Sequence, residues 1–146
     1  MMTMRPHALP PIQPCCPPVV PPQAIYSADP ESVRAARRYV REATACQEPS
    51  VTEDALGTLE LVTSELVTNA VRYGTEPGDS FLVKVGAQPG SCRIEVHDTC
   101  RRRPRIRPAS DERVRGRGMH LVEALAVQWG VNDREFGKIV WAVVVW

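Results

Sequence analysis

The chain has 146 residues, of which 43% are hydrophobic and 24% are charged, and its formal net charge is +1. This length and composition predict one globular domain with a hydrophobic core. The small net charge identifies no class of partner. No apolar run approaches the roughly 20 residues of a membrane-spanning helix, so we expect no membrane partner.

The first 23 residues are predicted to be a proline-rich disordered tail that precedes a domain over residues 24–146. Eight of the 14 prolines fall before residue 23 and interrupt every apolar stretch, which disfavours a targeting signal. A solvated tail and a proline-rich ligand for a partner are the two interpretations. The five cysteines are odd in number and none forms a C-x-x-C pair, so we expect free thiols and a cytoplasmic location.

Two helices are predicted in the first half of the domain. Asp29-Pro30-Glu31 has the residues of a helix start, and this helix should end before Pro49. Ser50-Val51-Thr52-Glu53 has the pattern of a capping box. Apolar residues then recur at intervals of three and four until Gly74, which predicts a helix with one buried face.

Strands and a third helix are predicted in the second half. Alternating patterns predict a hairpin of strands over residues 81–87 and 92–98, and residues 99–115 show no periodicity. A helix should run from Gly116-Arg117-Gly118 to Gly130, followed by strands over 131–136 and 139–146. The last strand is apolar on both faces, so we expect it to be well covered. Adjacent strands predict an α+β two-layer sandwich, with a mixed or antiparallel sheet and helices on one face.

Three features of the sequence point to chemistry. Glu65 and Asn69 lie four residues apart on one side of a helix, where a carboxylate can act as a base and an amide oxygen can bind Mg²⁺. Asp98 shares the inward face of its strand with core residues and suits the amino group of a base. Gly116-x-Gly118 at a helix start lets backbone approach a phosphate. Taken singly, an exposed polar helix face explains the first feature better, a loop-capping aspartate explains the second equally well, and a lone Gly-x-Gly is a weak signal.

Together and in this order, the three features resemble the N, G1 and G2 boxes of the GHKL (Bergerat-fold) ATPase superfamily. The stretches that carry the resemblance are LVTSELVTNAVRYG, IEVHDTC and RGRGMHLVEALAVQWGV. They are most similar to the single-domain anti-sigma factor serine/threonine kinases of actinobacteria, the HATPase_c_2 group. The resemblance covers roughly residues 26–146.

The resemblance implies a role for each motif residue. Asn69 would coordinate Mg²⁺ between the phosphates of ATP, and Glu65 would be catalytic by activating the attacking hydroxyl. Asp98 would bind the adenine amino group. The segment 99–115 would be the ATP lid. The remaining nucleotide-binding residues would come from the start of the third helix: Arg115, Gly116, Arg117, Gly118 and Met119.

The sequence departs from the family pattern at three positions. Cys100 stands where a glycine is common after Asp98, and Tyr73 stands where a histidine is common. Ile139 is expected at the place of a threonine that supports the adenine-binding aspartate. The departures at Cys100 and Ile139 affect the adenine side of the site, while Glu65 and Asn69 are intact.

The predicted function is an ATP-binding anti-sigma regulator that phosphorylates a serine or threonine of a STAS-type antagonist protein and sequesters a sigma factor. A homodimer is a further expectation from the resemblance. The alternative is a non-catalytic module that binds nucleotide weakly and switches partners by protein contact alone. Eight arginines between residues 101 and 117 raise the question of nucleic acid, but no aromatic residue interleaves with them, so nucleic-acid binding is disfavoured.

Overall fold

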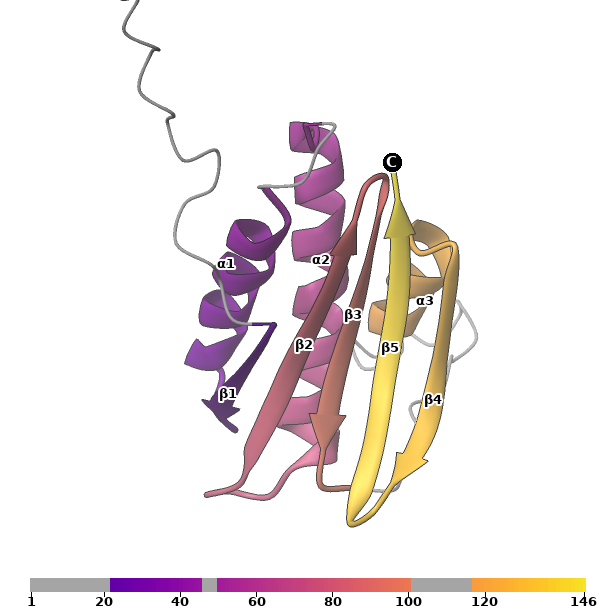
Figure 1. Cartoon of the computed structure of the whole chain (residues 1–146). Coiled ribbons are helices and arrows are strands. Elements are labelled where there is room, and N and C mark those ends of the chain that lie inside the picture. Colours follow the sequence, from indigo (N-terminus) through magenta and orange to yellow (C-terminus); the bar gives the residue numbers. More distant parts are fainter. Residues whose placement is uncertain (1–21, 46–49, 101–116) are drawn as a thin grey trace, which may run out of the picture.

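The computed structural model describes residues 22–45, 50–100 and 117–146 (Figure 1). Most of the predicted tail and of the predicted lid therefore lies outside the described residues. The same is true of Arg115 and Gly116, whose predicted contacts with nucleotide stay predictions.

The described part of the chain folds into two layers, a sheet and a set of helices that cover one of its faces (Figure 1). The sheet has five strands in the order β1-β2-β3-β5-β4, and every neighbouring pair is antiparallel. This confirms the predicted α+β sandwich. The elements are β1 (Gln23–Ser27), α1 (Glu31–Ala45), α2 (Glu53–Asn69), the π-helical turn η1 (Ala70–Gly74), β2 (Ser80–Gln88), β3 (Ser91–Asp98), α3 (Arg117–Leu125), β4 (Gln128–Arg134) and β5 (Gly137–Val145).

The helix starts confirm one predicted cap and correct the other. The Asp29 carboxylate accepts a hydrogen bond from the Ser32 backbone N–H at 3.2 Å, as expected for the residue that caps α1. For α2, the cap is Thr52, whose hydroxyl accepts from the Ala55 N–H at 3.1 Å. The prediction that the capping box begins at Ser50 is therefore wrong by two residues.

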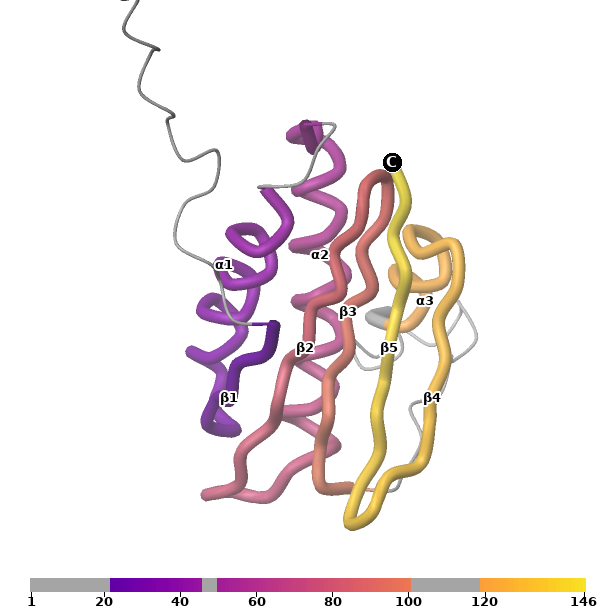
Figure 2. Tube along the Cα trace, in the orientation of Figure 1, coloured from indigo at the N-terminus to yellow at the C-terminus, as the bar shows by residue number. Residues whose placement is uncertain are grey.

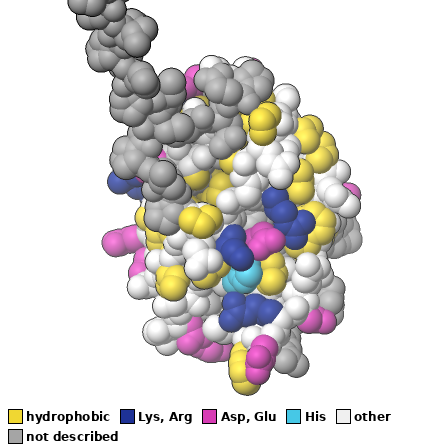
Figure 3. Space-filling model, in the orientation of Figure 1, with side chains coloured by type: hydrophobic (Ala, Val, Ile, Leu, Met, Phe, Trp, Pro, Cys, Tyr) yellow, Lys and Arg dark blue, Asp and Glu magenta, His cyan; other side chains and the backbone are white. Residues whose placement is uncertain are grey.

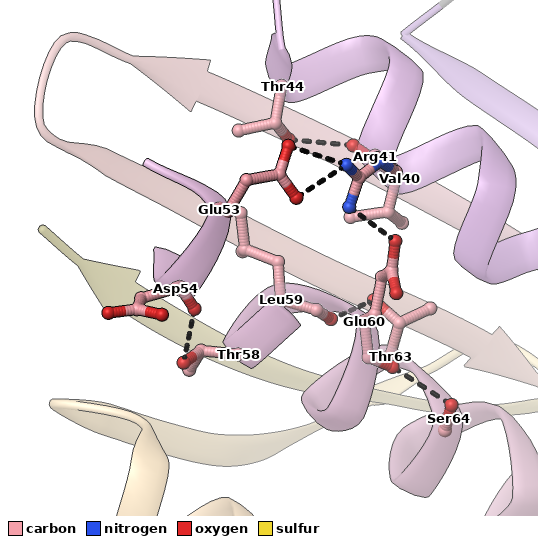
Figure 4. Close-up of polar contacts among 10 residues, drawn as sticks. All are labelled: Val40, Arg41, Thr44, Glu53, Asp54, Thr58, Leu59, Glu60, Thr63 and Ser64. Carbon is pink, nitrogen blue, oxygen red and sulfur yellow. Dashed lines mark hydrogen bonds and ion pairs between the residues drawn. The ribbon is translucent and has the colours of Figure 1, made fainter. Parts of the chain in front are cut away.

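Glu53 contributes to packing between helices. Arg41 of α1 donates to both carboxylate oxygens of Glu53, at 2.9 and 2.8 Å, and to Glu60 at 3.0 Å (Figure 4). One guanidinium thus joins two carboxylates of α2 to α1. This contact adds a surface link to the apolar packing of α1 on α2, and its exposed position makes it weak and sensitive to salt.

The β2–β3 hairpin matches the prediction, but two other strands do not. The short strand β1 was not predicted; it pairs with β2, and its Tyr26 ring stacks on Phe81 with centroids 5.7 Å apart. The predicted third helix is too long, because Trp129 and Gly130 belong to β4. A Cβ on Gly130 would lie 2.7 Å from the Trp141 ring, so the missing side chain lets this indole lie across β4.

The core lies between the helices and the inner face of the sheet. Side chains from every described helix and from the central strands meet there with almost no exposed surface. The largest fully buried side chains are Phe81, Leu59, Leu66, Ile94 and Met119. No helix in the described ranges is long and apolar enough to cross a membrane.

No helix within residues 22–45, 50–100 and 117–146 covers the outer face of the sheet, which mixes charged with apolar side chains (Figure 3). On β3, Glu95 accepts from Arg93 at 2.9 Å and lies 3.0 Å from the His97 ring nitrogen. The Arg93 guanidinium also stacks on Trp141 of β5 at 4.1 Å. The expectation that β5 is well covered holds for its inner face, while its outer residues are half-buried or, at Val145, exposed.

The C-terminal residue lies beside the β2–β3 turn, at one end of the sheet (Figure 2). The Trp146 backbone N–H donates to the Gly90 carbonyl at 3.0 Å. At the opposite end, β3 finishes beside η1 and the β4–β5 turn. The predicted site residues lie toward this second end.

Candidate functional site

The first part of the candidate site is the last turn of α2. Glu65 and Asn69 lie one helical turn apart and are both half-buried. Burial raises the pKa of Glu65 above its ordinary value of 4.5, and the Arg72 guanidinium opposes this shift. A carboxylate with a raised pKa is better suited to accept a proton than an exposed one.

A π-helical turn begins immediately after Asn69. The Ala70 N–H donates a hydrogen bond that is divided between the carbonyls of Leu66 and Val67. The chain then continues through η1 to Gly74. Single π-helical turns inside helices are frequent at functional sites, because they change the direction of the side chains that follow. Here the turn ends the helix at the buried Gly74 and brings the backbone to β3.

The second part of the site is the start of α3, which packs against Asn69. The Asn69 side-chain N–H donates to the Met119 sulfur at 3.0 Å. With the amide in this orientation, its nitrogen faces Met119 and its oxygen is available to a cation. The backbone of Arg117 and Gly118 lies in the first turn of α3, so this contact joins the first and third sequence motifs.

The third part of the site is Asp98, at the end of β3. Its side chain is 2% exposed and faces the helix layer, as the strand alternation predicts. One carboxylate oxygen accepts from the Cys100 N–H at 3.0 Å, and the other accepts from the Lys138 ammonium at 2.8 Å. Burial raises the pKa of Asp98, while Lys138 and the Cys100 N–H counteract the effect of burial.

Glycine allows the segments around Asp98 to meet. A Cβ on Gly74 would clash with the Asp98 carboxylate, and a Cβ on Gly137 would clash with the Asp98 carbonyl. Thr99 adds a hydrogen bond from its N–H to the Gly74 carbonyl at 3.2 Å. The end of η1, the end of β3 and the start of β5 therefore come together with backbone in close contact.

Lys138 is the site residue that sequence reasoning missed. It pairs across the sheet with Asp98, whereas Ile139 pairs with His97 and points to the other face. The expectation that Ile139 occupies the position supporting Asp98 is therefore wrong. Lys138 shares the two-residue period of the inward Val140, Ala142 and Val144. Because the strand is apolar on both faces, its sequence alone does not show which face is the inward one.

Residues 26–144 match the protein family described as the histidine kinase-like ATPase domain. The chain belongs to this family. The match covers all the described elements apart from the first residues of β1 and the last residue of β5. No curated protein matches the chain.

Two solved structures are similar to this chain. The chain is similar to the histidine kinase domain of the blue-light activated histidine kinase from Erythrobacter litoralis EL346, with 20% identity and a TM-score of 0.47. It is also similar to a second structure of that kinase, with 22% identity and a TM-score of 0.47. Each match covers 79% of this chain, and it covers 58% of the first and 40% of the second chain.

Proposed function

We propose that this histidine kinase-like ATPase domain binds Mg-ATP and phosphorylates a serine or threonine of a STAS-type antagonist protein, and so controls a sigma factor by partner switching. The observation that carries the proposal is the hydrogen bond between Asn69 and Met119 at 3.0 Å. It brings the end of α2 against the start of α3, so an amide oxygen and a helix N-terminus lie together. A helix N-terminus favours phosphate, and an amide oxygen favours Mg²⁺.

One amide oxygen from the protein, that of Asn69, is enough to bind the magnesium ion of a nucleotide. In nucleotide sites, Mg²⁺ takes most of its ligands from phosphates and water and few from protein. Asn69 can supply one oxygen while its nitrogen stays bonded to Met119. When bound, ATP would supply the γ-phosphoryl group, and its Mg²⁺ would neutralise part of the negative charge on the phosphates.

The transfer needs one residue of this chain to manage a proton. The hydroxyl oxygen of the target side chain attacks the γ-phosphorus, and the bond from this phosphorus to the bridging oxygen of ADP breaks. Glu65 accepts the proton of the hydroxyl as the new bond forms. Its half-buried position beside Asn69 supports this assignment.

The second candidate is a module that binds nucleotide weakly and switches partners by protein contact, without catalysis. The observation that favours it is that both oxygens of the buried Asp98 already accept hydrogen bonds, from Cys100 and Lys138. Adenine must share this carboxylate with groups of the protein. Partner contact alone would then carry the function, and a homodimer remains a prediction under either candidate.

Calorimetry with Mg-ATP tests nucleotide binding, with a matched control in the sequence. Asn69 and Asn132 are the only asparagines of the 146 residues, and Asn132 is exposed on β4. We expect Asn69→Ala to weaken Mg-ATP binding at least about tenfold through loss of a charge-assisted contact, and Asn132→Ala to leave it unchanged. If the unaltered protein binds no Mg-ATP at millimolar nucleotide, both candidates that include ATP are contradicted.

A pull-down with and without ATP, followed by mass spectrometry, separates the two candidates. The kinase predicts capture of a sigma factor and a small antagonist that gains phosphate on a serine or threonine only when ATP is present. The non-catalytic module predicts the same partners without any transferred phosphate. Gel shifts at low salt test the disfavoured nucleic-acid function.

A further inference from the structure

Lys138 lies where an additional contact with the nucleotide base can form. We propose that the Lys138 ammonium donates a hydrogen bond to the ring nitrogen N1 of adenine, while Asp98 accepts from the neighbouring amino group. The proposal rests on the proposed function, because it concerns the base of the same nucleotide. It makes Lys138 a residue that determines affinity and base preference.

The position of the ammonium is fixed by two strands. Asp98 and Lys138 are direct partners in the β3–β5 register, and both side chains point to the helix layer. The ammonium lies 2.8 Å from an Asp98 oxygen and 2.8 Å from the Cys100 carbonyl. Both side chains are almost completely buried, with exposed fractions of 5% and 2%. Lys138 therefore cannot move away from Asp98 without breaking two hydrogen bonds.

The hydrogen-bonding capacity of the pair is not exhausted by these contacts. An ammonium has three N–H donors, and within residues 22–45, 50–100 and 117–146 two acceptors for it are present, on Asp98 and Cys100. An ionised carboxylate has about four acceptor positions, and Asp98 uses one on each oxygen in the same ranges. One donor and two acceptor positions thus remain side by side.

Adenine presents the complementary pattern. Its amino group is a donor, and the adjacent ring nitrogen N1 is an acceptor. An aspartate alone can satisfy the amino group but offers nothing to N1. The adjacent ammonium supplies that missing donor, so the pair matches two neighbouring atoms of the base where Asp98 alone matches one.

A purely structural role for Lys138 makes a different prediction. A buried carboxylate needs a partner, and Lys138 provides one whether or not a base is bound. In that case the identity of the atom at N1 would be irrelevant to Lys138. An ATP analogue with carbon in place of N1 distinguishes the two roles.

The test measures binding of ATP and of 1-deaza-ATP to the full chain and two variants. Lys84 and Lys138 are the only lysines of the 146 residues, and Lys84 is exposed on β2, so Lys84→Met is the matched control. We expect the unaltered protein and Lys84→Met to prefer ATP over 1-deaza-ATP about tenfold, the usual effect of one hydrogen bond to a charged group. Lys138→Met should bind ATP more weakly and lose this preference. An unchanged preference in Lys138→Met would overturn the proposal.

A second measurement needs no variant and covers the case in which Lys138→Met does not fold. Protein labelled with ¹³C-lysine gives side-chain signals from two lysines only. Saturating ATP should shift the Lys138 ε-carbon signal and not that of Lys84, and 1-deaza-ATP should shift it less. ATP binding that leaves the Lys138 signal in place would refute this inference while the proposed function stands. If the chain binds neither nucleotide, the proposed function fails as well.

Discussion

At the scale of single residues, burial gives Glu65 a different chemistry from an exposed glutamate. Its pKa is raised by burial, so the folded protein holds the proton more tightly than the unfolded chain. A group of this kind stabilises the fold when it is protonated, at pH values below its ordinary pKa. As the pH rises through its pKa in the folded state, that contribution is lost. Glu65 therefore costs the protein stability at neutral pH, as expected of a residue kept for function.

Glu65→Gln should separate the stability that the ionised Glu65 costs at neutral pH from its role in phosphoryl transfer. We expect the variant to bind Mg-ATP normally and to lose phosphoryl transfer, because glutamine cannot accept the proton. Its Tm should exceed that of the unaltered protein at pH 7.5, and the two should converge below pH 4.5, the ordinary pKa of the carboxyl. Transfer by the unaltered protein should fall as the pH drops through the raised pKa of Glu65.

The matched control for Glu65 is the same substitution at the exposed Glu76. Scanning calorimetry across pH and a phosphate-transfer assay with the captured partner measure the two effects. Glu76→Gln should change neither. A Glu65→Gln protein that transfers phosphate at the normal rate would show that Glu65 is not the base.

At the scale of elements, helix ends were less predictable than helix interiors. Ser50 and Thr52 both have hydroxyls, and each is followed by acidic residues, so the local sequence offers two starts for α2. The structure uses Thr52. With this start, Glu53 lies in the first turn and reaches Arg41 of α1, a tertiary contact that the local pattern cannot show.

The choice of cap gives a prediction for stability. Thr52→Ala should lower the free energy of unfolding by about 0.5–2 kcal/mol, because the Ala55 N–H loses its acceptor. Ser50→Ala should have almost no effect. Urea unfolding of both variants measures the difference. A larger loss of unfolding free energy for Ser50→Ala than for Thr52→Ala would show that Ser50 is the cap, as the sequence pattern indicated.

The prediction of the boundary between α3 and β4 was wrong for a related reason. Trp129 continues the apolar spacing of the preceding helix, but it also fits the alternation of a strand. In the structure it pairs with Ala142, and the neighbouring Gly130 pairs with Trp141. Packing of the Trp141 indole over Gly130 favours the strand, and this partner lies eleven residues away in the sequence.

At the scale of the whole molecule, the site depends on the close approach of segments that are far apart in sequence. Asn69 contacts Met119, and Gly74 packs on Asp98, which pairs with Lys138. The approach at Gly74 leaves no room for a side chain. A single methyl group at this position therefore tests whether η1 and β3 must touch.

Gly74→Ala should destabilise the fold by about 1–3 kcal/mol, because the added methyl group meets the Asp98 carboxylate and the backbone must shift. Gly57→Ala in α2 is the matched control. No heavy atom lies within 4 Å of its added Cβ, so it should stabilise the helix by about 0.5–1 kcal/mol. Chemical unfolding gives both values. Equal stability of Gly74→Ala and the unaltered protein would contradict the close contact.

The sequence by itself determined the fold class, most of the elements, and the motifs around Glu65, Asn69, Asp98 and Gly118. Periodicity and spacing are local properties, so they can be read along the chain. Only the tertiary structure decided that Asn69 meets Met119 and that Lys138, in place of Ile139, pairs with Asp98. Strand register selects one of two opposite faces for every side chain, and it is fixed by the packing of the whole sheet.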